Sequence, residues 1–383
     1  MTHAKLRLAM IGGAAPSMIG PVHRIAALMD GRFEIVAGVP SSDPAKGRIA
    51  GAEWGLAAAH IHPDIGALLA AEAGRLDAVA ICTPNDSHYA YVKAALEAGL
   101  HAIVDKPLCN DAAQGQELAE LARARGSVLA LTHAYAGYPM VRDARTRVAR
   151  GEIGELRMVL VEYLGAGLAR KVEEDTGAAR RWRLDRARSG PSLVLGDIGT
   201  HAHHLACFVA GRRMVEISAE VGALMPGRAV HDYAQIRFRM EGGARGAMTV
   251  CQGAAGAEND ILVRVYGSLG HVEWRHADHN HLKLAFLDGE TRIYGRGQPN
   301  VTPEAARATR IARGGHPEGL HEAFANLYSD FAAAIEATRK GTSAASASPD
   351  LPMGDDGADG LRFVAAALSS SSRQGQLVAI RSG

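Results

Sequence analysis

The chain has 383 residues, of which 47% are hydrophobic and 22% charged, and its formal net charge is +1 at pH 7. The length permits two domains, and the near-neutral charge excludes the strongly basic face of a general nucleic-acid or membrane-surface binder. The 4 cysteines show no CxxC spacing, which argues against a disulfide framework or a structural zinc site. The first apolar run ends at a glycine too early for a signal peptide, and no run approaches the roughly 18 residues of a membrane helix. We therefore expect a cytoplasmic protein.

The N-terminus predicts a strand at 6–11, a glycine-bearing turn and then a helix at 21–29. That order is the context of a dinucleotide pyrophosphate site, because glycine lets the backbone approach the phosphates and the helix N-terminus supplies N–H groups. Ala14 takes the usual place of the second glycine, so the turn by itself fits an ordinary tight turn equally well. The candidate cofactor contacts in this turn are Gly12, Gly13, Ser17, Met18 and Ile19.

The second predicted strand, 33–39, ends without the acidic residue that usually holds the adenosine ribose. Asp43 can hold a ribose diol, which favours NAD, and it can equally cap the next helix. Serine hydroxyls with a cation can instead hold the 2′-phosphate of NADP, and these candidates are Ser41, Ser42, Lys46 and Arg48. We expect NAD or NADP, with NAD favoured.

Strands and helices then alternate along the chain. The predicted segments are strands at 77–82, 102–104 and 128–131 and helices at 88–98 and 111–125. This βαβα order predicts an N-terminal Rossmann domain with a doubly wound parallel sheet over residues 1–134.

The strand at 102–104 stops at Asp105 and Lys106, because Pro107 cannot continue its hydrogen bonding. Lys106 therefore lies near the carboxyl end of a buried strand, where open α/β sheets place their ligands. The alternative is an ordinary lysine of a surface loop.

Beyond residue 134 the pattern changes to short strands separated by glycine turns. They are predicted at 157–163, 216–223, 233–240, 244–251, 261–266, 271–274 and 282–286. They indicate a C-terminal α+β domain over 135–383 with a large, mostly antiparallel sheet, one side of which is exposed or faces a partner. Helices at 320–338 and 359–370 flank a flexible loop at 341–357, and the last helix, extended to 372, can pack back near the domain junction.

Asp197 and His201 precede an apolar run and are four residues apart, so they share one face of a predicted helix. A carboxylate beside an imidazole orients the ring and raises its basicity, which suits a general base. The alternative is an N-cap aspartate with an unrelated histidine. His203 and His204 diverge on a helix and no second ligand set has metal spacing, so we predict no metal site.

With these motifs in view, the chain resembles the Gfo/Idh/MocA family of sugar and polyol oxidoreductases nearly end to end. The similar segments are the turn from Gly12 to Gly20 followed by His23, Thr83-Pro84-Asn85 with His88, Ala98-Gly99-Leu100-His101 followed by Asp105-Lys106-Pro107, Gly196-Asp197-Ile198-Gly199-Thr200-His201, and Asp359-Gly360-Leu361. Two departures are the residues inserted in the first turn and Asp105 in place of the usual glutamate.

The resemblance implies an NAD(P)-dependent oxidoreductase in which hydride passes between a sugar or cyclitol hydroxyl and nicotinamide C4. Lys106 would hydrogen-bond the reacting hydroxyl, His201 would accept its proton and Asp197 would position that pair. On the cofactor side the resemblance implies Thr83, Pro84, Asn85, His88, Asp105 and Lys106. It also implies a homo-dimer or homo-tetramer, for which the C-terminal sheet offers the surface.

From their context, Tyr135, Trp182 and Arg183 can face the substrate, with Trp182 stacking on a sugar ring and Arg183 meeting an anionic group. Two other functions stay open. One is a glycoside hydrolase that oxidises its substrate transiently and needs a further acid or base, for which the candidates are Tyr135, Tyr163 and His133. The other is a non-catalytic dinucleotide-binding sensor, which would have no chemical need for the set Lys106, Asp197 and His201.

Overall fold

The computed structural model describes residues 4–174 and 182–380. The chain divides into two compact units, the first formed by Met1–Ala134 with Leu320–Ala358 and the second by Tyr135–Gly319 with Asp359–Gly383. We describe each unit by itself.

The sheet of the first unit is parallel throughout, in the order β2-β1-β3-β4-β5. Its strands are β1 (Leu6–Gly12), β2 (Phe33–Val39), β3 (Ala78–Cys82), β4 (His101–Val104) and β5 (Leu129–Leu131). The three central strands are apolar and almost wholly buried, as strands covered on both faces must be. The predicted doubly wound parallel sheet is confirmed.

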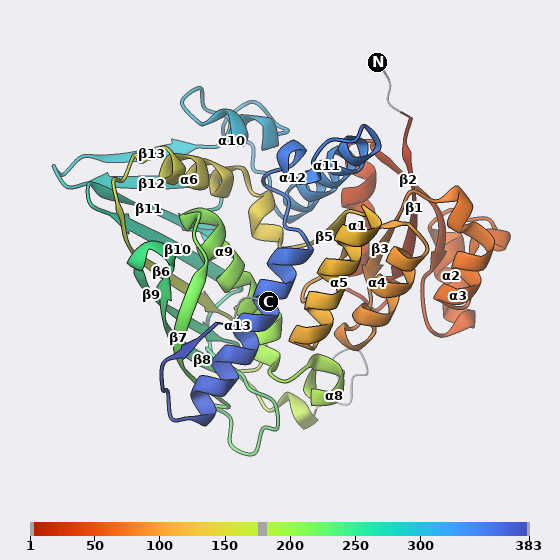
Figure 1. Cartoon of the computed structure of the whole chain (residues 1–383), viewed down its shortest axis with the longest axis horizontal. Coiled ribbons are helices and arrows are strands. Elements are labelled where there is room, and N and C mark those ends of the chain that lie inside the picture. The colour runs from red at the N-terminus through yellow and green to blue at the C-terminus, as the bar shows by residue number, and fades with distance from the viewer. Residues whose placement is uncertain (1–3, 175–181, 381–383) are drawn as a thin grey trace. The chain divides into compact units, whose positions relative to one another are not determined.

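Helices of the first unit follow the strands along the chain (Figure 1). They are α1 (Ile19–Met29), α2 (Pro44–Glu53), α3 (Ile65–Glu72), α4 (His88–Glu97), α5 (Ala112–Arg125), α11 (Leu320–Arg339) and α12 (Ala344–Ala347). The Asp111 side chain accepts a hydrogen bond from the Gln114 N–H at 2.9 Å, and Gly126 closes α5 in the left-handed region at φ 64°.

Helix α11 lies in the first unit, whereas the sequence analysis assigns it to the C-terminal domain. The reason is aromatic packing between segments that are far apart in the chain. Tyr328 lies edge-on to His23 of α1 and Phe33 of β2, and Phe331 stacks on Phe33 with 5.8 Å between ring centroids. A helical period shows that α11 has an apolar face but not which domain covers it.

The segment 341–357, predicted to be a flexible loop, is largely ordered. It contains α12 and the first turn of α13 (Gly354–Ser372), and the Leu131 N–H donates to the Pro352 carbonyl at 2.9 Å. A Cβ at Gly357 would lie 2.7 Å from a methyl carbon of Leu131. The small residues of this segment therefore allow close packing against β5, although their composition is also that of a loop.

The second unit is built on nine strands in the order β13-β12-β11-β10-β6-β9-β8-β7-β14. Their bounds are β6 (Leu156–Leu164), β7 (Met214–Gly222), β8 (Tyr233–Met240), β9 (Arg245–Cys251), β10 (Asp260–Gly267), β11 (Gly270–Arg275), β12 (His281–Phe286), β13 (Thr291–Gly295) and β14 (Val378–Ala379). Every neighbouring pair is antiparallel except β6 and β9, which are parallel. The predicted mostly antiparallel sheet is thus confirmed.

Two of the nine strands are absent from the sequence-based expectation. Strand β13 carries exposed Thr291, Arg292 and Ile293 at the edge of the sheet, and β14 has only 2 residues. Edge strands are kept short and charged, which removes the alternating pattern used to recognise them.

Helices cover one face of this sheet, where α6 and α9 contact its strands (Figure 1). The helices of the unit are α6 (Pro139–Ala149), α8 (Arg186–Ser189), α9 (Thr200–Ala210), α10 (Pro303–Ala308) and the larger part of α13. Alternate residues of β8 such as Ile236 and Phe238 are buried, whereas Arg237 and Arg239 are exposed.

Among the described residues no helix is long and apolar enough to cross a membrane.

Candidate functional site

The turn after β1 forms a close backbone cradle. Gly12 and Gly13 have φ of +82° and +94°, and a Cβ at Gly20 would lie 2.2 Å from the Gly13 carbonyl oxygen. The Ser17 hydroxyl accepts a hydrogen bond from the Gly20 N–H at 3.1 Å in the first turn of α1. A turn whose glycines Gly12, Gly13 and Gly20 have no room for a Cβ, followed by a helix N-terminus, fits the pyrophosphate of a dinucleotide.

The residues after β2 are organised by Asp43. Its Oδ1 accepts hydrogen bonds from the N–H groups of Ala45 at 2.9 Å and Lys46 at 3.3 Å, so Asp43 caps α2. The Ser41 hydroxyl accepts from the Asp43 N–H at 3.1 Å. The capping role considered for Asp43 is therefore present, and it places a carboxylate near the carboxyl end of β2.

Lys106 follows β4, and its neighbour Asp105 belongs to a chain of polar groups. Asp105 Oδ1 accepts the Thr132 hydroxyl at 2.6 Å and lies 3.9 Å from Nε2 of the fully buried His23. The other ring nitrogen of His23 is 2.8 Å from the Tyr328 hydroxyl. Burial raises the pKa of the Asp105 carboxyl, but His23, Lys106 and Thr132 more than offset this and hold it well below its usual value. Asp105 is therefore an ionised, fixed neighbour of Lys106.

His88 has a structural position rather than one open to a cofactor. Its ring is fully buried, with Nδ1 2.8 Å from the Pro107 carbonyl oxygen and Nε2 2.9 Å from the Thr83 carbonyl oxygen. The Ser87 hydroxyl donates to Thr83 Oγ1 at 2.7 Å, which shapes the turn that contains buried Asn85. His88 thus ties the turn after β3 to the segment that carries Lys106.

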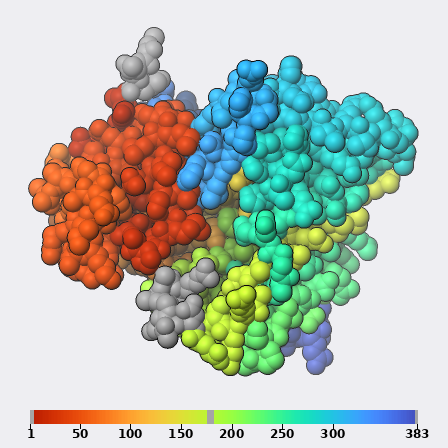
Figure 2. All heavy atoms as spheres, turned by 180° about the vertical axis from the view of Figure 1, so that it is seen from behind, coloured from red at the N-terminus to blue at the C-terminus, as the bar shows by residue number. Residues whose placement is uncertain are grey.

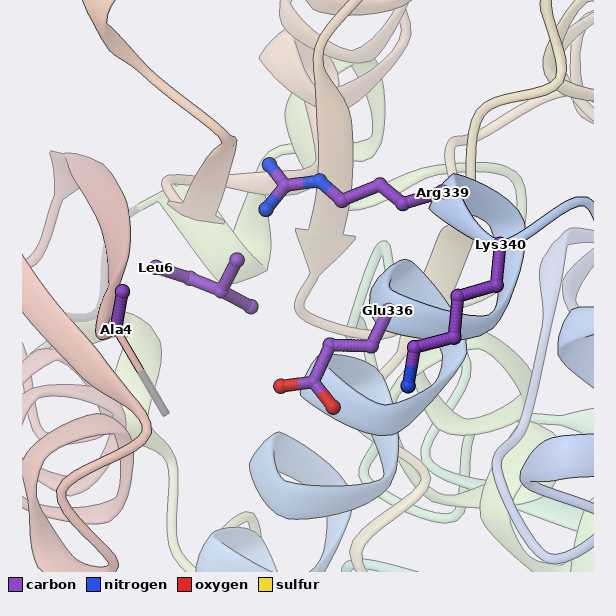
Figure 3. Close-up of a pocket in the computed structure, with 5 residues that line it drawn as sticks. All are labelled: Ala4, Leu6, Glu336, Arg339 and Lys340. Carbon is purple, nitrogen blue, oxygen red and sulfur yellow. The ribbon is translucent and has the colours of Figure 1, made fainter. Parts of the chain in front are cut away.

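A shallow hollow also lies in the first unit, lined by Ala4, Leu6, Glu336, Arg339 and Lys340 (Figure 3). It lies beside the amino end of β1, whereas Lys106 follows the carboxyl end of the parallel strand β4. Ligands of such sheets bind at the carboxyl ends of the strands, so this hollow is separate from the candidate cofactor site.

Asp197 lies in a π-helical turn, Leu195–Gly199, that leads directly into α9. One regular helix is predicted through Asp197 and His201, but the wider π-helical turn changes the register between them. The Thr200 hydroxyl donates to the Gly196 carbonyl at 2.9 Å within this junction. Such turns are frequent at functional sites because they re-aim a side chain.

The side chains of Gln252 and Arg183 donate hydrogen bonds to Oδ2 of Asp197. The Gln252 amide nitrogen lies at 2.6 Å and the Arg183 guanidinium at 3.2 Å. Arg183 also stands over the half-buried Trp182 ring, 5.5 Å from its centroid. The sequence analysis proposes Arg183 for an anionic substrate, whereas here its charge is directed at Asp197.

A buried pair of tyrosines stands beside His201. The Tyr135 ring lies edge-on to the His201 ring with 5.1 Å between centroids, and its hydroxyl donates to the Tyr163 hydroxyl at 2.7 Å. The Tyr163 hydroxyl donates in turn to Asn259 Oδ1 at 3.0 Å. Burial raises the pKa of Tyr163 to about 12 and raises that of Tyr135 as well. Both hydroxyls therefore remain protonated at neutral pH.

The second unit thus holds two sets of contacts, which we call the second-unit cluster: Arg183 is bonded to Asp197, and Tyr135 lies beside His201. Sequence reasoning missed Gln252 and Asn259. Gln252 immediately follows β9 and Asn259 immediately precedes β10. A polar amide at a strand end is a common feature, and only the pairing of β6 with both strands brings these two residues to the cluster.

Comparison with known proteins agrees with this architecture. The model of an oxidoreductase family with an NAD-binding Rossmann fold matches residues 6–133, and that of the GFO/IDH/MocA C-terminal domain matches residues 141–273. "Uncharacterized oxidoreductase YfiI" of Bacillus subtilis is 34% identical over 365 residues, which cover 94% of this chain and 93% of that protein.

Two similar solved structures come from Azotobacter vinelandii. Each is 36% identical to this chain, and the match covers 98% of this chain and 97% of the chain in that structure. One is an inositol dehydrogenase homologue complexed with NAD⁺, with a TM-score of 0.93. The other is an inositol dehydrogenase homologue complexed with NADH and myo-inositol, with a TM-score of 0.90. The chain described here therefore belongs to the Gfo/Idh/MocA family of oxidoreductases, and its first unit contains an NAD-binding Rossmann domain.

Proposed function

We propose that the protein is an NAD-dependent dehydrogenase of a neutral polyol ring, either a cyclitol or a sugar. The observation that carries the proposal is the joint presence of Lys106 after a Rossmann strand and of Asp197 and His201 in the second unit. The chain is 36% identical to an inositol dehydrogenase homologue complexed with NADH and myo-inositol, and this similarity also supports a neutral polyol ring as the substrate.

Each residue of the set has one role in the proposed reaction. Lys106 donates a hydrogen bond to the oxygen of the reacting hydroxyl, and His201 accepts the hydroxyl proton at an imidazole nitrogen. Asp197 orients the groups around that proton. When bound, nicotinamide supplies a hydride acceptor at C4. Asp105, held by Thr132 and His23, keeps the Lys106 segment in place.

The charge of the second-unit cluster favours an uncharged substrate. The Arg183 guanidinium lies 3.2 Å from the Asp197 carboxylate, so the two charges offset each other. The other members, Tyr135, Tyr163 and Asn259, offer neutral hydroxyl and amide groups. A polyol satisfies such groups with its own hydroxyls, whereas the charge of a sugar acid or a phosphorylated sugar would meet, among these second-unit residues, only a cation already paired with Asp197.

The residues after β2 support NAD rather than NADP as the cofactor. The Asp43 carboxylate is fixed at the N-terminus of α2 by two backbone N–H groups. A fixed carboxylate there accepts hydrogen bonds from ribose hydroxyls and repels a 2′-phosphate. Lys46 and Arg48, the cations considered for NADP, belong to the same helix.

The test follows absorbance at 340 nm with purified protein, NAD or NADP, and a panel of cyclitols, sugars, sugar acids and glycosides. We expect reduction of NAD with neutral polyols and its loss in Lys106→Ala. Lys93→Ala is the matched control, because Lys93 forms a surface ion pair with Glu117. An unchanged rate in Lys106→Ala would refute the role given to Lys106.

The same assay separates dehydrogenase from glycosidase. Cleavage of a glycoside with no net change at 340 nm would support transient oxidation instead. We prefer the dehydrogenase because Tyr135 and Tyr163, two of the three candidates for the further acid or base, have pKa values raised by burial, so near neutral pH they neither release a proton readily nor act as bases. Binding of NAD without any turnover would favour a sensor.

We also propose that the open face of the nine-stranded sheet joins copies of this chain. Leu160 lies there between Ala247 and Arg264 of the neighbouring strands, and Met158 is 38% exposed. Figure 2 shows the strand region of the second unit, green to cyan, at the surface seen from behind. A half-apolar sheet face is typical of an interface.

Light scattering after size-exclusion chromatography tests the oligomer. We expect a dimer or tetramer for the wild type and a monomer for Leu160→Asp. Leu287→Asp, in the turn between β12 and β13, is the control because Leu287 is 84% exposed outside that face. A wild-type monomer would contradict the proposal.

A further inference from the structure

We propose that Gln252 is a positioning residue that keeps Asp197 ionised and oriented during proton transfer. The inference rests on the proposed function, because it concerns the same site. The Gln252 amide nitrogen is 2.6 Å from Asp197 Oδ2, closer than the Arg183 guanidinium at 3.2 Å. Solvent screens the Arg183 pair, since that side chain is 42% exposed, while the side chain of Asp197 is 16% exposed. The contact with Gln252 is therefore the stronger of the two.

The amide of Gln252 can serve Asp197 only as a donor. Its oxygen is buried and has no hydrogen-bond partner within the described part of the chain. If the amide were turned over, that oxygen would face the carboxylate and repel it. The bond to Asp197 alone therefore fixes the orientation of the amide. Reciprocally, the bond favours the charged form of the carboxyl.

The backbone of Gln252 is held on both sides. Its N–H donates to the Asp232 carbonyl at 2.8 Å, and its carbonyl accepts the Leu168 N–H at 2.8 Å. The Arg228 guanidinium, fully buried, donates to Asp232 Oδ2 at 2.7 Å and to the Leu168 carbonyl at 2.6 Å. The two segments that flank Gln252 are thus tied together by one buried cation.

Glu173 completes this support. It accepts from Nε of Arg228 at 2.7 Å and from Nη2 at 3.2 Å, a two-point contact that fixes the guanidinium plane. The Arg228 cluster holds the two segments beside Gln252, and the Gln252 side chain contacts Asp197. The Arg228 and Asp232 side chains are buried, whereas Glu173 lies at the outer end of the network with 31% of its side chain exposed.

The test compares Gln252→Leu and Gln252→Glu with the wild type. In Gln252→Leu we expect kcat to fall on the order of 10- to 100-fold, since one hydrogen bond to a charged group is lost, with the Kd of NAD unchanged. In Gln252→Glu two carboxyls would share one proton, so the acidic limb of the kcat/KM profile should move up by at least about one pH unit. Gln376→Glu, an exposed position of the same unit, is the control.

Failure of this inference is separate from failure of the proposed function. An active wild type whose kcat is kept by a folded Gln252→Leu, or whose pH profile is kept by Gln252→Glu, would overturn the inference alone. If the wild type reduces no cofactor with any polyol, an infrared titration still decides. The carboxyl band absent from Asp197→Asn should then appear at higher pH in Gln252→Leu than in the wild type, and an unchanged midpoint would overturn the inference.

Discussion

The two units hold their candidate reactive groups in different ways. In the first unit Asp105 and Lys106 are consecutive residues at the end of β4, and the Thr132 contact comes from just beyond the neighbouring strand β5. In the second unit Asp197 sits on a π-helical turn, and Gln252 reaches it from a different part of the chain. Parallel strands bring their ends to one edge by topology alone, whereas the second cluster depends on a particular strand order. The first arrangement is therefore readable from local motifs and the second is not.

The largest expected effect separates the chemistry of the second unit from cofactor binding. His201→Ala should lower kcat roughly 10²- to 10⁴-fold, because a general base is lost, and should leave the Kd of NADH unchanged. Steady-state rates at 340 nm and NADH fluorescence measure the two quantities. His321→Ala, at an exposed position of α11, is the control. Equal losses in kcat and in NADH affinity would contradict the assignment of proton transfer to the second unit and of cofactor binding to the first.

Acid should weaken the second unit through His203. This side chain is 5% exposed and stacks on Phe363, and burial lowers its pKa to about 4, below the usual value near 6.5. Between about pH 4 and pH 6.5, His203 therefore binds a proton in the unfolded chain but not in the folded one. His203 costs no stability above about pH 6.5, and about 3 kcal/mol is lost as the pH falls towards 4.

Urea unfolding across this pH range checks the effect. His203→Leu should show a flatter dependence of the free energy of unfolding on pH, while His316→Leu, at an exposed position, should behave like the wild type. The same slope in His203→Leu as in the wild type would show that other groups dominate the acid response.

The backbone cradle of the first unit should be sensitive to one methyl group. In Gly20→Ala the new Cβ would meet the Gly13 carbonyl oxygen at 2.2 Å. Relief of such an overlap costs about 1–3 kcal/mol, and NAD binding should weaken by about 10- to 100-fold if the cradle has to shift. Gly74→Ala is the control, because a Cβ there meets no atom within 4 Å. Unchanged NAD affinity, measured by calorimetry, would place the pyrophosphate elsewhere.

The smallest effect concerns the polar chain behind Lys106. With ionised Asp105 beside Nε2 of His23, the ring proton belongs on Nε2 and the Tyr328 hydroxyl donates to Nδ1. Tyr328→Phe should therefore cost about 1–2 kcal/mol of unfolding free energy, the usual penalty of an unpaired buried acceptor. Tyr89→Phe, which loses an exposed hydrogen bond to Glu117, should cost less than about 0.5 kcal/mol. Equal costs would mean that His23 is not held in this way.

Much of the fold follows from the sequence because the signals are local. The apolar runs of β1 and β3 and the Gly126 cap of α5 each depend on neighbouring residues. The position of α11 does not, since Tyr328 and Phe331 find their partners about 300 residues away, at His23 and Phe33. Edge strand β13 is missed because three consecutive residues, Thr291, Arg292 and Ile293, are all exposed, so no alternating burial pattern marks the strand.

The same distinction holds for the candidate site. Lys106 is singled out by the proline that ends its strand, a feature of three adjacent residues. Gln252 and Asn259 have no such mark, and the tertiary pairing of β6 with β9 and β10 brings them to Asp197 and Tyr163. A single sequence records no pairing of this kind.

The most direct measurement is the initial rate of NAD reduction by a neutral polyol in Lys106→Ala, His201→Ala and the double variant. If both residues act on one hydroxyl, the double variant should be about as slow as the slower single variant, since groups that act as a unit are strongly non-additive. Two losses that multiply would show that the residues act independently. That result would contradict the proposed action of both residues on the same hydroxyl.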